Sequence, residues 1–385
     1  LSPRVTIVSF YLPFIRLLAV LLSVASGLRA IPASADNGGI IESFVARATE
    51  GNPRHTESDV LVRRDGSLLV AWSDFYAGSR DDAPARISAA VSADGGRTWG
   101  PRSTLQENIG GANVMSVSFL RSRTGDVLFF FLQKNSLTDL KAYVRRSTDD
   151  ARTWGTPTLV TADPGYHVMN NARVIQLRSG RLLAPVASSK QVWTKNDDFR
   201  TSVYLSDDDG RTWRRSRTLL SAPKRGAMEP GLVELKDGRV MQIIRTQTGF
   251  IWRSFSSDGG ETWTDAAPWD VESPESPATL AVTPGGDWLL VWNPKVVWSN
   301  PEKTVLGANH GGARTPLATM MSADEGRTWS PSRYLEGNPD STFAYTSVTF
   351  HEGRALLTYY DFPKGGKLLS LKFKSVPLAW FRAAP

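Results

Sequence analysis

The sequence predicts an all-β protein, a six-bladed β-propeller with five Asp-box turns whose ring is closed by an N-terminal strand. Three observations support this fold class: a short box occurs five times, a glycine hairpin occurs six times, and an extra strand precedes the first hairpin. Self-similarity at a long period indicates a repeat architecture, and a unit of about 55 residues with four short strands has the size of a propeller blade.

The repeated box has the skeleton Ser-x-Asp-x-Gly-x-Thr-Trp. Its copies begin at Ser92, Ser147, Ser206, Ser256 and Ser322, and only the second departs from the skeleton, with Ala151 in place of glycine. Ser and Asp side chains bind the backbone groups of turns, glycine permits a tight turn, and Trp packs between sheets. We therefore predict that each box fastens a turn and has no part in catalysis.

Six hairpins alternate with the boxes. Each has two short apolar runs, rich in Val, Leu, Phe and Trp, on either side of a glycine. Because glycine adopts positive φ without steric cost, this pattern predicts a β-hairpin. The turn glycines are Gly66, Gly125, Gly180, Gly238, Gly286 and Gly353.

One predicted strand has no hairpin partner. Residues 39–48, GIIESFVARA, precede the first hairpin, whereas the last unit lacks a box. We expect this strand to complete the last blade, because closing the ring protects sheet edges that would otherwise be exposed.

Residues 1–35 are predicted to be a hydrophobic leader, and residues 36–385 the propeller. The leader has an apolar run followed by small residues, which resembles a secretory signal with cleavage near Ala30 or Ala35. We therefore expect a secreted or periplasmic protein with no stable membrane span after cleavage. A single membrane anchor is the alternative, although two arginines leave its apolar core short for a span.

Composition narrows the classes of function. The chain has no cysteine, which excludes disulfides, thiolate catalysis and Cys-ligated zinc. Its four histidines show no metal-ligand spacing, so we expect no metal and no other cofactor. A net charge of +7 can attract anionic partners, but the basic residues are scattered, which argues against nucleic acid.

Polar segments occur where a propeller would bring chain segments together. If the hairpins and boxes share one face, the starts of the first strands and the ends of the second strands converge on the axis at the opposite face. These places are unusually polar; the segments are 55–58, 113–116, 167–173, 227–231, 275–278 and 344–347. We therefore expect the functional site on that face.

Five boxes at blade spacing resemble the sialidase (neuraminidase) superfamily with its bacterial neuraminidase repeats. The resemblance covers about residues 40–380 and implies a glycoside hydrolase that releases a terminal, sialic-acid-like sugar. In this family arginines hold the substrate carboxylate, and Tyr is the nucleophile because a carboxylate would repel the substrate. A Glu draws off the phenol proton and an Asp acts as general acid/base.

The resemblance also implies roles for particular residues. Tyr345 in FAYTSVTF matches the nucleophile, and Glu229 in MEPGLVEL matches its proton acceptor. Asp82 or Asp81, in GSRDDAPARIS, is the candidate general acid/base.

Two of the family's three substrate-holding arginines have counterparts at Arg245 and Arg314. The first normally lies in an Arg-Ile-Pro-like motif, where this chain reads RHTESDVLV. Thr56 or Glu57 stands about where that arginine belongs. Either Arg54 substitutes for it, or the chain binds a different sugar.

Further contacts to a glycan substrate are expected from the polar segments and from the ends of the second strands. The candidates are His55, Glu57, Arg173 and Asn171 in the segments, and Lys134 at the end of a second strand. Two other functions remain open: a non-catalytic propeller that binds glycans, and a glycosidase or lyase that acts on another sugar with His55 and Glu57 in its chemistry.

Overall fold

The structure is a computed structural model of the chain. It describes residue 1 and residues 39–193, 197–294 and 314–383. Residues Gly38–Pro385 form one compact unit. Apart from residue 1, the expected leader lies outside the described residues and stays a prediction. Among the described residues, no helix has the length and apolar character that a membrane crossing requires.

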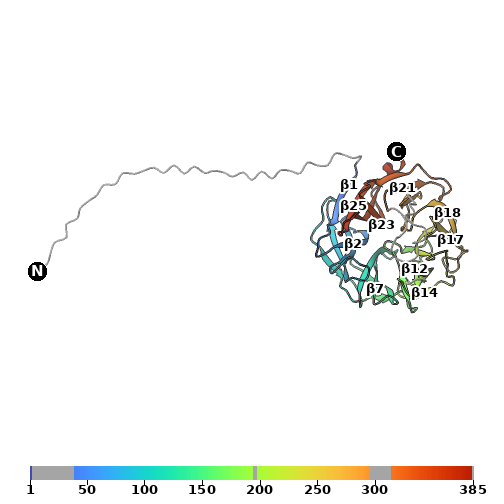
Figure 1. Cartoon of the computed structure of the whole chain (residues 1–385), viewed down its shortest axis with the longest axis horizontal. Coiled ribbons are helices and arrows are strands. Elements are labelled where there is room, and N and C mark those ends of the chain that lie inside the picture. The colour runs from blue at the N-terminus through green and yellow to red at the C-terminus, as the bar shows by residue number, and fades with distance from the viewer. Residues whose placement is uncertain (2–38, 194–196, 295–313, 384–385) are drawn as a thin grey trace. The chain divides into compact units, whose positions relative to one another are not determined.

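The predicted all-β class is confirmed. The described residues form four sheets of four strands each and one sheet of nine, besides the short helix α1 (Leu378–Arg382). Figure 1 shows these sheets arranged around a common centre.

Each four-stranded sheet is antiparallel. The first contains β2 (Arg54–Val62), β3 (Leu68–Phe75), β4 (Ala85–Ser92) and β5 (Ser103–Gln106). Two later sheets contain β15 (Met228–Glu234), β16 (Val240–Arg245), β17 (Phe250–Ser256) and β18 (Ala267–Glu272), and β19 (Thr279–Val282), β20 (Trp288–Trp292), β21 (Leu317–Ser322) and β22 (Arg333–Glu336). The last contains β23 (Ser341–His351), β24 (Arg354–Pro363), β25 (Ser370–Pro377) and β1 (Ile41–Ala46).

The nine-stranded sheet has two halves. One half contains β6 (Asn113–Arg121), β7 (Val127–Lys134), β8 (Leu140–Ser147) and β9 (Thr158–Leu159). The other contains β10 (Tyr166–Val168), β11 (Ile175–Gln176), β12 (Leu182–Ser189), β13 (Arg200–Ser206) and β14 (Arg214–Arg215). The halves join where Tyr166 of β10 pairs with Leu140 of β8 in parallel.

The second strand of most sheets is buried along its whole length. All eight residues of β3 are buried, as are all six of β16 and all five of β20. These runs of large apolar residues are covered on both faces by neighbouring sheets, so they lack the polar alternation of a half-exposed strand. The hydrophobic core therefore lies between neighbouring sheets, and polar groups lie toward the common centre.

The glycine hairpins have the predicted conformation. The six turn glycines have φ between 71° and 98°, the left-handed region that other residues seldom adopt. The hairpins therefore turn where the sequence pattern predicted.

The boxes fasten turns, as predicted. In the first copy Ser92 Oγ donates to Asp94 Oδ1 (2.7 Å) and accepts from the Gly96 N–H (2.8 Å). The Thr98 N–H donates to Asp94 Oδ1 at 2.9 Å. The other four copies repeat this pattern, including the second, where Ala151 adopts a φ of 64° in place of glycine.

The extra strand predicted at residues 39–48 corresponds to β1. It pairs antiparallel with β25, so that Ile41 lies opposite Ser375. The order of the last sheet is β1-β25-β24-β23, which combines strands from distant parts of the chain.

Candidate active site

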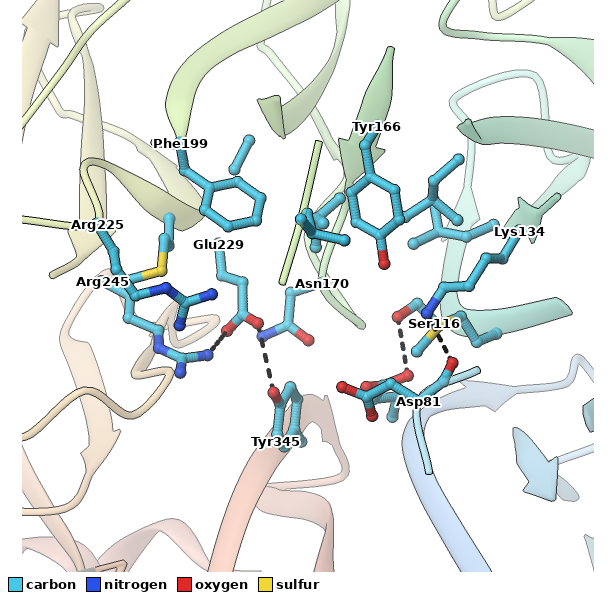
Figure 2. Close-up of a pocket in the computed structure, with 18 of the residues that line it drawn as sticks. Asp81, Ser116, Lys134, Tyr166, Asn170, Phe199, Arg225, Glu229, Arg245 and Tyr345 are labelled. Atoms are coloured by element: carbon cyan, nitrogen blue, oxygen red, sulfur yellow. Dashed lines mark hydrogen bonds and ion pairs between the residues drawn. The ribbon is translucent and has the colours of Figure 1, made fainter. Parts of the chain in front are cut away.

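A pocket lies where the starts of the first strands of several sheets approach one another (Figure 2). We call the first strand of each sheet, such as β2, β6, β15 and β23, its innermost strand. Its polar lining comes from four sheets. The polar residues are Glu57, Asp81, Ser116, Lys134, Asn170, Arg225, Glu229, Arg245 and Tyr345. Apolar side chains form the remaining wall; they include Met115, Leu132, Leu140, Val168, Phe199 and Met228. A concave site with a few convergent polar groups is typical of small-molecule binding.

Four of the polar residues occupy the same kind of position in their strands. Glu57 on β2, Ser116 on β6, Glu229 on β15 and Tyr345 on β23 each lie at a register shift against the next strand. Their φ values are 52°, 56°, 37° and 58°. A bulge of this kind redirects a side chain, and a left-handed non-glycine residue costs about 1–3 kcal/mol. Such strain is typical of functional sites.

Tyr345 and Glu229 meet across the pocket. Tyr345 Oη donates to Glu229 Oε1 at 3.3 Å, and Figure 2 shows the two side chains pointing toward each other. Burial and then the Glu229 carboxylate raise the pKa of Tyr345 above its usual value, against the lowering effect of Arg245 and Arg314. The phenol is therefore neutral near pH 7, and its proton lies within hydrogen-bond reach of a Glu229 carboxylate oxygen.

Two predicted arginines adjoin this pair. Arg245 Nη1 donates to Glu229 Oε2 at 2.7 Å, and the Arg245 side chain is buried. The Arg314 guanidinium lies 5.5 Å from the centre of the Tyr345 ring and donates to Tyr360 Oη at 3.0 Å. Both lie where an anion beside Tyr345 could be held.

A third arginine, Arg54, reaches the same region. It is the first residue of β2, and its Nη1 lies 2.5 Å from Asp81 Oδ1. Its guanidinium packs over the Phe75 ring at 4.4 Å and is also close enough to Tyr345 for an electrostatic interaction. We call Arg54, Arg245 and Arg314 the arginine cluster. In the sequence Arg54 lies slightly before the position where the family's first arginine is expected. The sequence alone does not show at which residue β2 begins.

The structure separates the two candidate acids. Asp81 lines the pocket and its carboxylate binds Arg54. The Asp82 side chain is 47% exposed and pairs with Arg80 at 2.9 Å, outside the pocket lining. The two aspartates are adjacent in a turn that the Ala83 N–H closes on the Arg80 carbonyl oxygen, and of the two only Asp81 lines the pocket.

Glu57 and Lys134 also line the pocket. Glu57 accepts hydrogen bonds from Ser116 Oγ (3.1 Å) and Ser73 Oγ (3.3 Å), and burial raises its pKa. Lys134 is 2% exposed, and its Nζ donates to the carbonyl oxygen of Asp81 at 2.7 Å. Burial lowers the pKa of Lys134.

His55 lies elsewhere than expected. It is 1% exposed and does not line the pocket; its ring packs edge-on against Trp72 and its Nδ1 lies 3.3 Å from Asp74 Oδ1. His55 precedes the bulge and keeps the regular register of β2, opposite Asp74, so its side chain stays within the first sheet. Glu57 lies in the bulge itself, and its side chain turns toward the pocket.

Asn171 and Arg173 also lie outside the pocket lining, buried near the centre of the ring. Asn171 Nδ2 donates to the carbonyl oxygens of Ser58 (2.8 Å) and Tyr345 (3.0 Å). Arg173 Nη2 donates to the carbonyl oxygen of Ala278 at 2.9 Å. Both satisfy backbone groups of neighbouring innermost strands, and Asn171 thereby helps to hold Tyr345 in its left-handed conformation.

Several pocket residues were not singled out from the sequence. Besides Tyr166 and Phe199, they include Arg225, whose guanidinium binds Asp197 (2.9 Å) and Glu275 (2.6 Å). The polar segments 167–173 and 227–231 indicated the region. Nothing in their pattern distinguishes a residue that faces the pocket from one that binds backbone.

Comparison with known proteins identifies the family. Residues 50–357 match the family model described as a BNR repeat-like domain. The chain belongs to this family. It is also a member of the sialidase-like superfamily, as the resemblance predicted.

The relatives are distant. The chain is 27% identical to the sialidase of Micromonospora viridifaciens over 416 residues, which cover 98% of this chain and 60% of that protein. It spans about 60% of the length of this sialidase and of those of Bacteroides fragilis and Clostridium perfringens.

Solved structures share the fold. A Hadza microbial sialidase superimposes with a TM-score of 0.68 at 20% identity, covering 88% of this chain and 69% of that one. The Trypanosoma rangeli sialidase, in a covalent intermediate with 2,3-difluorosialic acid, gives a TM-score of 0.68 at 16% identity, covering 89% and 60%. At this identity the likeness shows the propeller fold alone.

Proposed function

We propose that the chain is an exo-acting glycoside hydrolase of the sialidase-like class, which releases a terminal acidic sugar through a tyrosine nucleophile. The observation that carries this proposal is the 3.3 Å hydrogen bond from Tyr345 Oη to Glu229 Oε1, beside the arginine cluster. The sialidase relatives support the same chemistry.

The proposed first step forms a glycosyl–tyrosine bond. The arginine cluster holds the sugar carboxylate, which leaves the anomeric carbon near Tyr345 Oη. Tyr345 attacks this carbon while Glu229 takes the phenol proton. Asp81, which is paired with Arg54 in the structure, takes up a proton once the sugar carboxylate replaces it at Arg54. The glycosidic bond breaks, and Asp81 gives this proton to the departing oxygen. A neutral phenol carries no charge to repel the sugar carboxylate, which is why tyrosine suits this substrate.

In the proposed second step, water releases the sugar. Asp81, now ionised, takes a proton from water, whose oxygen attacks the anomeric carbon. The bond to Tyr345 breaks, and the phenolate recovers its proton from Glu229. Two displacements at one carbon retain its configuration.

We further propose that the ring has six blades and that β1 closes it. The two halves of the nine-stranded sheet, counted separately, would give six units with the four other sheets. Secretion through the N-terminal leader is likewise proposed, on the composition of residues 1–35.

The test is hydrolysis of fluorogenic α-sialoside, uronide and neutral glycosides by wild type, Tyr345→Phe and Tyr334→Phe. Tyr334 is 56% exposed and is absent from the pocket lining, so it is a matched control. Sialoside turnover that only the Tyr345 variant loses supports the proposal. Equal turnover by wild type and Tyr345→Phe rejects the mechanism.

A different acidic or neutral sugar is the second candidate, and Glu57 favours it. Its carboxylate lines the pocket near Arg54, with Nη2 to Oε1 at 3.7 Å, and would offset part of the charge that holds an anion. Uronide or neutral-glycoside turnover without sialoside turnover would establish this candidate. Binding without turnover of any glycoside would indicate a glycan-binding propeller.

A further inference from the structure

The loop that carries Asp81 depends on a neighbouring sheet for its position. It joins β3 to β4, and its base is closed by a bond from the Tyr76 N–H to the Pro84 carbonyl oxygen at 3.2 Å. Nearer the tip, the Ala83 N–H donates to the Arg80 carbonyl oxygen at 3.0 Å. Exposed residues make up much of the remainder, so these local bonds alone leave the position of Asp81 loosely determined.

Two buried side chains bind the backbone of this loop. Lys134 Nζ donates to the Asp81 carbonyl oxygen at 2.7 Å, and Asn113 Nδ2 donates to the same oxygen at 2.9 Å. Asn113 Nδ2 also donates to the Ala83 carbonyl oxygen at 2.8 Å. The two donors therefore occupy both acceptor positions of the Asp81 carbonyl. We call Asn113 and Lys134 the carbonyl clamp.

The carbonyl clamp is part of the rigid scaffold. Asn113 begins β6, Lys134 ends β7, and the two are opposite each other in the antiparallel register. Their side chains are 0% and 2% exposed. Side chains on paired strands hold their positions better than loop residues, because packing and ladder bonds restrict them.

Burying an ammonium group is costly, and Lys134 is buried to bind a backbone carbonyl. Its Nζ lies 5.6 Å from the centre of the Tyr166 ring, which adds a favourable cation–π contact. An uncharged side chain could satisfy a carbonyl at a lower desolvation cost. The carboxylates of Asp81 and Glu57 lie close enough to attract the ammonium group and so offset part of the cost of its burial.

The Asp81 carboxyl is held from the opposite direction. Its Oδ1 lies 2.5 Å from Arg54 Nη1, which belongs to the first sheet. Figure 2 shows Lys134 reaching the backbone side of Asp81. The loop is thus anchored by its backbone to β6 and β7 and by its side chain to β2.

We propose that Asn113 and Lys134 are positioning residues that set the distance between the Asp81 carboxyl and the leaving-group oxygen of a bound glycoside. This inference rests on the proposed function, because Asp81 must act as general acid. A misplacement of about 1 Å can lower such a step about a hundredfold.

The test compares two α-sialosides that differ in the acidity of the leaving group. An activated phenol leaves without a proton, whereas a sugar or alkyl alcohol needs general acid assistance. Wild type, Asn113→Ala, Lys134→Met and Lys141→Met are measured on both. Lys141 is the matched control, because its Nζ also donates to a backbone carbonyl, that of Asp163, away from the pocket.

We expect Asn113→Ala and Lys134→Met to lose about a hundredfold in kcat/KM on the alcohol glycoside and about threefold or less on the activated one. Lys141→Met should resemble wild type on both. Equal losses on the two substrates, or no loss on either, would overturn the proposal, since a merely structural defect does not depend on the leaving group.

Absence of wild-type turnover would reject the proposed function, and a second measurement then tests the carbonyl clamp alone. Hydrogen exchange of the loop amides, residues 76–83, should be faster in Asn113→Ala and Lys134→Met than in wild type and Lys141→Met. Unchanged exchange in both clamp variants would show that the loop does not depend on these residues.

Discussion

Tyr345 Oη donates to Glu229 Oε1 at 3.3 Å although the two residues are 116 positions apart in the chain. They come from β23 and β15, and each lies at a bulge with positive φ near the start of an innermost strand. The same local distortion, repeated in sheets around one centre, directs both side chains to a shared point. The contact between Tyr345 and Glu229 therefore depends on a distortion that recurs in both strands, and not on either strand alone.

Removal of the Tyr345 hydroxyl should abolish turnover while the fold remains. We expect Tyr345→Phe to lose about a thousandfold or more in kcat, because the variant lacks the phenol oxygen that forms the glycosyl–tyrosine bond. The free energy of unfolding should fall by no more than about 1 kcal/mol, the contribution of one hydrogen bond. Kinetics and denaturant unfolding on the same samples check both; a loss of stability that matched the loss of rate would indicate a structural role instead.

Neutralising Glu229 should remove the base. We expect Glu229→Gln to lower kcat by about a hundredfold to ten-thousandfold, since an amide cannot accept the phenol proton. Glu234→Gln on the same strand is the control, because Glu234 binds the Arg178 N–H outside the pocket. A Glu229→Gln enzyme with a normal rate would show that Tyr345 needs no base.

The two neighbouring aspartates should differ sharply. Asp81→Asn should lose about a hundredfold or more on a glycoside with an alcohol leaving group, because a general acid is removed. Asp82→Asn should stay near the wild-type rate, since Asp82 pairs with Arg80 away from the pocket. The reverse order of losses would assign the acid to Asp82.

Glu57→Gln should improve binding of an anionic sugar, and more so at high pH. Burial raises the pKa of Glu57, so wild-type Glu57 keeps its proton to a higher pH than usual and resembles Gln in acid. Above that range the ionised carboxylate repels an anion, and its removal should lower KM by about threefold to tenfold. KM measured from pH 5 to pH 9 checks this; the same ratio at every pH would exclude titration of Glu57.

Stability should depend on pH through Asp59. Burial raises its pKa to about 7, even though the N–H groups of Phe119 and Val60 lower it. A pKa raised in the folded state means stabilisation that is complete below the unfolded value near 4 and lost as pH rises to about 7. Asp59→Asn should therefore flatten the fall of unfolding free energy between pH 4 and 7. An identical slope in wild type and variant would assign that pH dependence to other groups.

The repeats carried most of what could be predicted about the fold. The hairpin glycines and the boxes are local signals, because a tight turn needs specific residues at specific positions. The motifs around Glu229, Arg245, Arg314 and Tyr345 resemble those of the family, and these four residues lie at or beside the pocket.

The remaining site residues depend on geometry that has no local signal. A bulge decides that Glu57 faces the pocket while His55 does not. Asn171 and Arg173 are as polar as the pocket residues, but they bind backbone carbonyls at the centre. Asn113 looks like any polar residue that begins a strand. The structure shows its role, because the Asn113 side chain binds the backbone of a loop from another sheet.

The pairing of β1 with β25 also determines the order in which the chain can complete its fold. The Ala48 N–H, just after β1, donates to Ser370 Oγ, 322 positions later. During synthesis β1 therefore emerges long before its partner, whereas sheets such as β2–β5 have all their strands in one stretch and can form as they appear. An unpaired strand is a template for aggregation, and an exposed charge on it opposes this. Glu42 supplies such a charge while β1 is still unpaired. In the folded sheet the Glu42 carboxylate binds Lys372 at 2.7 Å.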